Sequence, residues 1–381
     1  GHGVAGGQYF DINTRHLQLL CVGLVLALGL SLLPAGMGLL LSLAVIAALV
    51  GLNLWLYRVH GLAMPLATAV ALALSASVIN MAHGYFFESR SKRALASRFR
   101  SYVPPELVDE MLKHPEHYSM QADNRELTVM FCDIRGFTTL SERMEPVQLQ
   151  ALLNTLFSRL THVIRQQRGT IDKYMGDCVM AFWGAPVAAP DHAHLAVQAA
   201  LDMVQAVHAV NTEHQAQGLP AIGVGVGLNT GPMCVGDMGS DVRRSYTVIG
   251  DAVNLGSRLE GLCKAYGVEI VASESTRAQA PGFVWLELDR VRVKGKEQAV
   301  AIYCPLGVAG RVAGERLQAM ESWHRWLTAF RAQNWPLCDE LWPSIQSNPA
   351  GDKLLHFYAQ RLQERRVLPY DPDWDGATHF D

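Results

Sequence analysis

The sequence lacks several features that mark common classes of protein. Its 381 residues carry a formal net charge of -3, so no basic excess points to a nucleic-acid partner. The glycines that alternate at residues 223–227 do not form a Gly-x-Gly-x-x-Gly dinucleotide fingerprint, and no phosphate-loop motif occurs in the sequence. Its seven cysteines include no Cys-x-x-Cys pair, and six come after the apolar N-terminal stretches. We therefore expect reduced thiols rather than a disulfide framework.

Charged side chains are also missing from two long N-terminal stretches, residues 17–57 and 61–87. A hydrocarbon core about 30 Å thick takes about 20 helical residues. With a turn at residues 34–38, these stretches predict three transmembrane helices, near 17–34, 36–57 and 62–86. Basic residues come directly after the third helix, so that end is expected in the cytoplasm. The prediction is a multi-pass protein of the plasma (inner) membrane, in contact with the lipid bilayer, with residues 1–16 outside the cytoplasm.

Residues 88–123 are first basic and then amphipathic around Pro104-Pro105. Because proline cannot continue a helix, the pattern predicts a helix, a break and a short second helix. Two interpretations remain open. The segment is either a solvated linker or a dimeric transducer that couples the membrane helices to the domain beginning at residue 124.

From residue 124 the pattern alternates strands and helices and predicts an α+β domain on an antiparallel sheet. Thr139-x-x-Glu142 resembles a capping box that opens a helix. The predicted elements are a strand at 126–132, a helix at 147–168, a hairpin at 170–183, a helix at 191–217 and a glycine-rich strand at 222–228.

The composition changes again at residues 307–381, which form a C-terminal extension rich in tryptophan. Its aromatic and leucine residues recur at helical spacing, which predicts two or three helices packed on one another. Residues 366–381 are expected to be a loose tail. No catalytic residue is assigned to this region.

Two aspartates at the ends of strand-like runs are the main candidates for chemistry. Asp133 lies in Phe-Cys-Asp-Ile-Arg-Gly-Phe-Thr and Asp177 in Asp-Lys-Tyr-Met-Gly-Asp. Alone, Asp133 could cap a helix and Asp177 could belong to a turn. Together, within a short stretch of chain, they are typical ligands for hard divalent cations.

A second candidate pair is Asn254 and Arg258, four residues apart and therefore on one helix face. Arginine presents a planar fork of donors that suits phosphate. Val253, Leu255 and Leu259 define the opposite side of the same helix as buried. An anionic substrate would thus meet metal on one side and arginine on the other.

Four motifs in this order resemble the catalytic domain of class III nucleotidyl cyclases, over about residues 124–306. These enzymes convert ATP or GTP to the cyclic monophosphate and pyrophosphate. The resemblance implies a ferredoxin-like sheet and a homodimer with its sites at the interface. It also implies two magnesium or manganese ions, held by Asp133, Asp177 and the carbonyl oxygen of Ile134. Arg258 would stabilise charge on the α-phosphoryl group, and Asn254 would orient the ribose.

The same resemblance assigns base recognition to Lys173 and Thr247. A lysine donor suits adenine, whereas family members that take GTP usually carry an acidic residue there, so ATP is the expected substrate. Thr247 departs from the aspartate most often found at its position. One of the two lysines in Lys294-Gly-Lys296 would contact the triphosphate. Lys296 is the candidate, and the choice between the two stays open.

The whole sequence therefore predicts a membrane-anchored, homodimeric adenylate cyclase under the control of an upstream sensor. Its arrangement resembles cyclases that carry an extracellular CHASE-type sensor before three membrane spans. Two alternatives remain, a guanylate cyclase and a catalytically silent dimeric receptor. The presence of Asp133, Asp177, Asn254 and Arg258 argues against the silent receptor.

Overall fold

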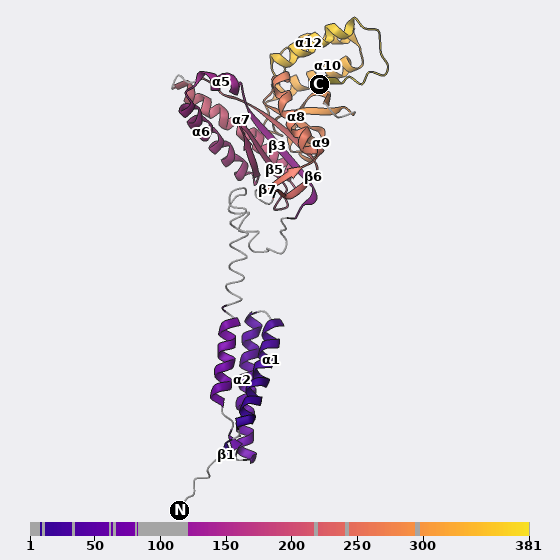
Figure 1. The fold of residues 1–381 in the computed structure, drawn as a ribbon. Helices are drawn as coiled ribbons and strands as arrows, with labels where there is room; N and C mark the ends of the chain where they lie inside the picture. Colours follow the sequence, from indigo (N-terminus) through magenta and orange to yellow (C-terminus); the bar gives the residue numbers. More distant parts are fainter. Residues whose placement is uncertain are drawn as a thin grey trace, which may run out of the picture. The chain divides into compact units, whose positions relative to one another are not determined.

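The computed structural model of the chain describes residues 8–9, 12–32, 35–60, 62–63, 66–80, 82, 121–216, 220–240, 244–293 and 298–380. The chain divides into two compact units, Gly1–Arg98 and Phe99–Asp381, which are described one at a time (Figure 1). Most of the predicted linker at 88–123 lies outside the described residues, so its helices and its transducer role stay predictions.

The first unit is built from apolar helices. Val22, Leu26 and Ala73 are buried between them. Many other large apolar side chains remain exposed, among them Leu24 and Leu54, which are 63% and 55% exposed. An apolar surface of this kind is what lipid would cover. The elements of this unit are α1 (Ile12–Leu32), α2 (Ala35–His60), a helical segment at residues 66–80, and the paired strands β1 (Gln8–Tyr9) and β2 (Leu62–Ala63).

Helices form where the three membrane spans were predicted, but they differ in length. Within the described residues, one segment, Leu40–His60, is long and apolar enough to cross a membrane. Two further apolar helical stretches, Leu19–Leu28 and Leu66–Asn80, are shorter. One helix among the described residues therefore meets the length and composition for a membrane span, and the multi-pass arrangement stays a prediction.

The second unit is built on a single sheet whose order is β11-β9-β10-β8-β6-β3-β5-β4, with β7 paired to β6. Within this sheet, the strands β6-β3-β5-β4 are antiparallel throughout. Strand β3 lies between β6 and β5, as in a split β-α-β arrangement. The strands are β3 (Asp123–Arg135), β4 (Thr170–Met175), β5 (Cys178–Trp183), β6 (Gly223–Gly239), β7 (Arg244–Ile249), β8 (Ile270–Ser273), β9 (Phe283–Val293), β10 (Val300–Val308) and β11 (Thr378–Phe380).

The mixed α/β fold agrees with the predicted class, but the sheet is not wholly antiparallel. β6 and β8 are parallel, and so are β9 and β11. Parallel neighbours need a crossover connection, and the chain makes one through α8 (Asp251–Tyr266) between β6 and β8. The spacing of Asn254 and Arg258 predicts a helix at this place, but no local pattern shows that the helix connects two parallel strands.

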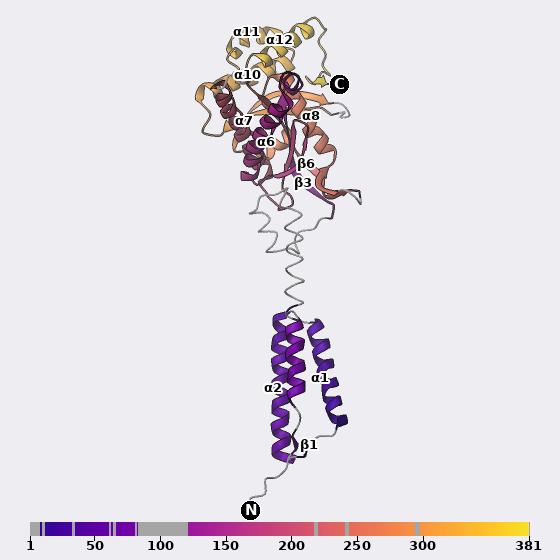
Figure 2. The ribbon, with the colours of Figure 1, turned by 60° about the vertical axis from the view of Figure 1, so that its left-hand side comes forward.

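Helices cover both faces of this sheet (Figures 1 and 2). On one face, Leu156 and Leu160 of α6 and Met203 of α7 pack on Met130 and Cys132 of β3. On the other face lies α8. The helices on the first face and their neighbours are α5 (Phe137–Arg143), α6 (Pro146–Gln166), α7 (His192–Ala216) and α9 (Glu274–Gln279).

Two glycines let α8 approach the sheet closely. A Cβ on Gly227 of β6 would lie 2.3 Å from the backbone nitrogen of Glu260, and one on Gly256 of α8 would lie 2.8 Å from Val129 Cγ1. Neither distance leaves room for a side chain. The glycines that alternate along β6 therefore serve helix packing, which fixes α8 beside the end of β3.

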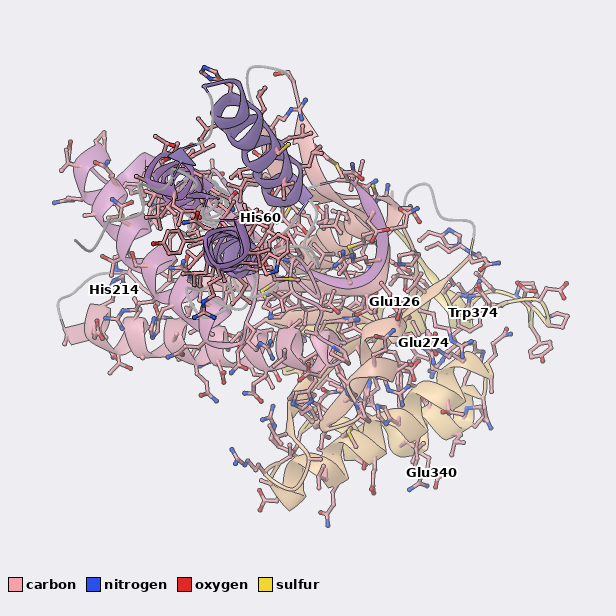
Figure 3. The ribbon with its side chains drawn as sticks, turned by 90° about the horizontal axis from the view of Figure 1, so that it is seen from below. His60, Glu126, His214, Glu274, Glu340 and Trp374 are labelled. Carbon is pink, nitrogen blue, oxygen red and sulfur yellow. The ribbon has the colours of Figure 1, made fainter. Side chains whose placement is uncertain are left out.

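The C-terminal extension shares a core with the cyclase-like part of this unit. Trp323, Trp326 and Tyr358 are fully buried, as the helical stripe predicted, and they pack with Leu259 and Tyr266 of α8. Arg365 stacks over the ring of Trp374, which Figure 3 labels, at 4.1 Å. The helices of the extension are α10 (Gly314–Arg331), α11 (Trp335–Leu341), the short η2 (Trp342–Ile345) and α12 (Asp352–Arg366).

A buried carboxylate joins this extension to the sheet. Asp289 of β9 accepts hydrogen bonds from Tyr266 Oη at 2.8 Å, from Arg361 Nη1 at 2.9 Å and from the Thr378 hydroxyl. The three donors come from α8, α12 and β11. A buried charge with this many partners is satisfied, and removing one partner would leave it uncompensated.

Two sequence predictions are wrong here. Residues 366–381 were expected to form a loose tail, yet Thr378–Phe380 is β11 and pairs with β9. The capping box at Thr139 is also absent, because α5 begins earlier, after Gly136, and Thr139 lies inside it. Gly136 has φ 71°, a left-handed conformation that glycine adopts readily and that starts the helix without a side-chain cap. All seven cysteines are free, as expected.

Candidate active site

Asp133 and Asp177 line one cleft. Asp133 lies near the end of β3, opposite Gly225 of β6, and is half-buried. Asp177 comes after Gly176, whose φ of 66° makes the tight turn between β4 and β5. The cleft has a volume of about 800 Å³ and its wall also includes Ile134. The strand ends thus bring the two predicted acids together with the residue whose carbonyl was predicted as a ligand.

Three carboxyl groups line the cleft, and the pKa values of two of them, Asp133 and Glu260, are raised. Burial, together with the nearby Asp177 carboxylate, which shares a hydrogen bond with it, raises the pKa of Asp133 to about 6. Burial also raises the pKa of Glu260 to about 7, with a further contribution from Asp133. Glu260 lies on α8 and lines the same cleft. A bound cation would relieve the repulsion among these three carboxyl groups.

The donor set fits a hard divalent cation. Two carboxylates and a main-chain carbonyl are oxygen ligands of the kind that magnesium and manganese take. No cluster of three or more His, Cys, Asp or Glu side chains suited to a metal occurs among the described residues. Magnesium usually keeps several waters and binds through one or two carboxylates plus substrate phosphates, so Asp133 and Asp177 are a sufficient protein contribution.

Asn254 and Arg258 lie one turn apart on α8, as predicted, but not on the wall of the acidic cleft. Asn254 is exposed and Arg258 is partly buried. Arg258 Nη1 is buried and has no hydrogen-bond partner among the described residues. An unpaired buried guanidinium nitrogen is costly, so this atom is a ready donor for an anion from outside the described chain.

Lys173 and Thr247 lie together around a third residue, Asp172. The Thr247 hydroxyl donates to Asp172 Oδ2 at 2.5 Å, and Lys173 Nζ lies 3.3 Å from Asp172 Oδ1. Val248 N also donates to Asp172 Oδ2, at 3.4 Å. Burial raises the pKa of Asp172, while these three donors lower it and favour the ionised form.

A β-bulge creates this cluster. In the pairing of β4 with β5 the register shifts between Ile171 and Lys173, so that Asp172 is the extra residue. A bulge re-aims the side chains at its site. The Asp172 carboxylate is therefore buried and faces β7, while its neighbour Lys173 stays about half exposed.

The structure thus groups the predicted residues into three sets. Asp133, Ile134 and Asp177 share the cleft, Lys173 and Thr247 share Asp172, and Asn254 and Arg258 share a helix face. Lys296 lies outside the described residues. The roles that the sequence predicts for these residues stay predictions.

Sequence reasoning missed Glu260, Asp172 and two lysines of the cleft wall, Lys264 and Lys353. Glu260 and Lys264 could have been found by extending the helix pattern beyond Arg258, since they lie four residues apart on a neighbouring stripe. Asp172 depends on a bulge and Lys353 on a distant helix, and the sequence carries no clear local signal for either.

Comparison with known proteins identifies the family. Residues 119–304 match the model of the adenylate and guanylate cyclase catalytic domain. Adenylate cyclase 1 of Rhizobium meliloti (strain 1021) is 38% identical over 215 residues, which are 56% of this chain and 32% of that protein. Among solved structures, the adenylyl cyclase CyaB from P. aeruginosa is 34% identical, with 51% of this chain and 100% of that chain covered and a TM-score of 0.47. The guanylyl cyclase Cya2 is also 34% identical, with 50% and 97% covered and a TM-score of 0.47.

The chain therefore belongs to the adenylate and guanylate cyclase family, and residues 119–304 carry its catalytic domain. It spans less than half the length of the first two curated adenylate cyclases that it matches, 32% and 47%. The extension after residue 304 lies beyond the family match.

Proposed function

We propose that this chain is a membrane-anchored adenylate cyclase that converts ATP to 3′,5′-cyclic AMP and pyrophosphate. The observation that carries the proposal is the pair Asp133 and Asp177, brought from two separate strand ends into one cleft within the family-matched region. The surrounding carboxylates need positive charge, and a metal-bound polyphosphate supplies a ligand that fits them.

In this reaction the ribose 3′-oxygen forms a bond to the α-phosphorus, and the bond from the α-phosphorus to the bridging oxygen of the pyrophosphate breaks. The hydroxyl proton passes to solvent and pyrophosphate leaves. Divalent cations bound at Asp133, Asp177 and the Ile134 carbonyl would activate the 3′-hydroxyl and neutralise the leaving group. The contribution of these three residues would be to hold the two cations in place.

Arg258 is proposed to stabilise the charge that develops on the α-phosphoryl group. Its buried Nη1 has no partner in the described chain, so a donor is available without breaking an existing bond. Asn254, one turn earlier on the same helix, is proposed to orient the ribose. Both side chains lie away from the acidic cleft of their own chain, which supports a site shared between two chains of a homodimer.

The cluster at Asp172 supports ATP over GTP. Because the Thr247 hydroxyl gives its proton to Asp172, its oxygen is left as an acceptor. An acceptor matches the exocyclic amino group of adenine and not the carbonyl oxygen of guanine. Lys173 is held beside it and supplies a donor for adenine N1. We propose that Asp172 sets the direction of the Thr247 hydroxyl and hence the choice of base.

Membrane anchoring is proposed from the first unit. Leu40–His60 is long and apolar enough to span, and its large apolar side chains are exposed. In the multi-pass arrangement, α1 and the segment at 66–80 complete the spans and the catalytic unit faces the cytoplasm. Control by an upstream sensor remains part of this proposal on the strength of the family resemblance alone.

The decisive experiment is to assay the purified chain with ATP, first with manganese and then with magnesium, and to measure cyclic AMP. A parallel assay with GTP, and competition between the two nucleotides, test the choice of base. We expect cyclic AMP to form and to require the cation. A folded protein that makes neither cyclic nucleotide with either cation would contradict the proposal.

A further inference from the structure

We propose that the C-terminal extension completes the substrate site, with Lys353 of α12 binding the polyphosphate end of the nucleotide beside Lys264 of α8. The inference rests on the proposed function and extends it to a region beyond the family match. It assigns a binding role to a helix in which the sequence alone indicated no functional residue.

The first observation is placement. Lys353 and Lys264 line the cleft of about 800 Å³ that Asp133 and Asp177 also line. Lys353 comes from a helix some 220 residues further along the chain than Asp133, as their numbers in the sequence show. The wall of the cleft therefore combines the proposed metal ligands with two flexible cations, which is the combination that a metal-bound polyphosphate requires.

The second observation is how firmly Lys353 is held. The two residues after it, Leu354 and Leu355, are buried in the core that the extension shares with α8. Gly267, the C-cap of α8, has φ 74°, and a Cβ there would lie 2.5 Å from Lys353 Cβ. The lysine stem thus lies directly against the backbone of Gly267, and only a residue without a side chain allows this approach.

The third observation is that both ammonium groups are available. Arg135, the other cation of the cleft, donates to the carbonyl oxygen of Val268. Among the described residues, no hydrogen bond or ion pair engages Lys264 or Lys353. A lysine carries three donors and can give all of them to phosphate oxygens.

A purely structural role explains Lys353 poorly. α12 begins after Gly351, so Lys353 lies in its first turn. Cations in the first turn oppose the helix dipole, and acidic residues are favoured there. The positive charge therefore does not serve α12 itself. Lys353 instead lines the cleft that Asp133 and Asp177 also line.

The test uses the full chain in detergent and the neutral variant Lys353→Gln. The measurements are the affinity for inorganic tripolyphosphate in the presence of manganese, by titration calorimetry, and the KM and kcat for ATP. We expect Lys353→Gln to weaken tripolyphosphate binding about five- to tenfold, which corresponds to about 1 to 1.4 kcal/mol, because the variant loses a charged hydrogen-bond donor. KM for ATP should rise by a similar factor while kcat changes less than about twofold.

Two further variants control the experiment. Lys353→Arg should restore most of the affinity, because it keeps the charge. Arg325→Gln removes one positive charge from an exposed position on α10 and should change neither affinity nor KM. Equal thermal midpoints in all variants would show that the extension stays folded.

The outcomes separate this inference from the proposed function. If wild type makes no cyclic nucleotide, the proposed function fails, and the tripolyphosphate titration still decides the role of Lys353. If wild type does not bind tripolyphosphate, or if folded Lys353→Gln binds it as tightly as wild type, the inference is overturned.

Discussion

The cleft at Asp133 and the cluster at Asp172 each hold a partly or fully buried carboxyl group on a strand, but the groups around the two carboxyls carry opposite charge. Around Asp172, the Lys173 ammonium supplies positive charge and the Thr247 hydroxyl donates a hydrogen bond to Oδ2, while Oδ1 accepts no hydrogen bond from the described residues. Around Asp133, burial and the Asp177 carboxylate together raise the pKa to about 6. Burial raises the pKa of both carboxyl groups, but the donors around Asp172 oppose this rise, whereas the Asp177 carboxylate adds to it at Asp133.

This difference separates two jobs. A carboxylate with its own donors fixes the direction of a hydrogen bond, so it can select a base. A carboxylate beside other carboxylates is stabilised when a cation binds, so it can take part in binding metal and a metal-bound substrate. We expect substitutions in the two places to change different quantities, turnover in the cleft and selectivity in the cluster.

The largest effect is expected in the cleft. Asp177→Asn should reduce the rate of cyclic AMP formation at least about 100-fold, because it removes charge that holds the cation and the lost stabilisation amounts to a few kcal/mol. The rate at saturating manganese and ATP measures the effect, and circular dichroism checks the fold.

Asp123→Asn is the matched control, since Asp123 lies on the same strand as Asp133 but is exposed and forms an ion pair with Arg125. That exposed pair is expected to contribute little to stability, and the variant should keep near-normal activity. A folded Asp177→Asn protein that works like Asp123→Asn would remove the basis for the metal site.

The next largest effect is expected in the cluster. Asp172→Asn should lower the ratio of ATP to GTP turnover about tenfold, because an amide can donate to Thr247 and free its hydroxyl to donate to guanine. The ratio of kcat/KM for the two nucleotides is the measurement. An unchanged ratio in a folded protein would show that Asp172 does not set the direction of the hydroxyl.

A mixing experiment brings the two regions together. By the proposed shared site, Asp133 of one chain works with Arg258 of the other. Random mixing of inactive Asp133→Ala and Arg258→Ala makes about half of the dimers mixed, each with one intact site, so about a quarter of wild-type activity should return.

The control for mixing is Asp133→Ala with Asp177→Ala, which should restore nothing because each site still lacks one metal ligand. Silence of the first mixture, although mixed dimers are shown to form by differently tagged chains, would contradict an interfacial site. So would recovery in the second mixture.

The sequence predicted the parts of the fold that depend on local patterns. Apolar runs that stop at glycine predicted the strand before Asp133 and the hairpin whose tip carries Asp177. The structure has β3, β4 and β5 at these places. The stripe through Trp323 and Tyr358 likewise predicted buried helices. Local spacing is sufficient for such elements.

The features that the sequence did not reveal depend on long-range contacts. Nothing near Thr378 indicates that it pairs with β9, since the pairing depends on Asp289 and Arg361. Lys353 reaches the cleft because Gly267 leaves room for it. The bulge at Asp172 depends on how β4 aligns with β5, which no single strand encodes.

The smallest expected effect is on stability, and it tests the unbalanced charge of the cleft directly. In the metal-free protein the pKa of Asp133 is raised from 3.8 to about 6 and that of Glu260 from 4.5 to about 7. Between about pH 4 and pH 7 the folded state therefore binds more protons than the unfolded state, so the free energy of unfolding falls as pH rises. Manganese at neutral pH should reverse this loss.

Glu260→Gln isolates this effect, because glutamine cannot ionise. With metal chelated, the thermal midpoint of wild type relative to Glu260→Gln should fall by a few degrees from pH 5 to pH 7.5, the size expected when about 1 kcal/mol is lost in a domain of this length. Taking the difference between the two proteins cancels His192, whose pKa is lowered by burial and whose contribution to stability is lost as pH falls below about 6.5. A difference that is flat with pH, or that rises, would mean that the pKa of Glu260 is not raised in the folded protein, and the contrast between the cleft and the Asp172 cluster would then lose its support.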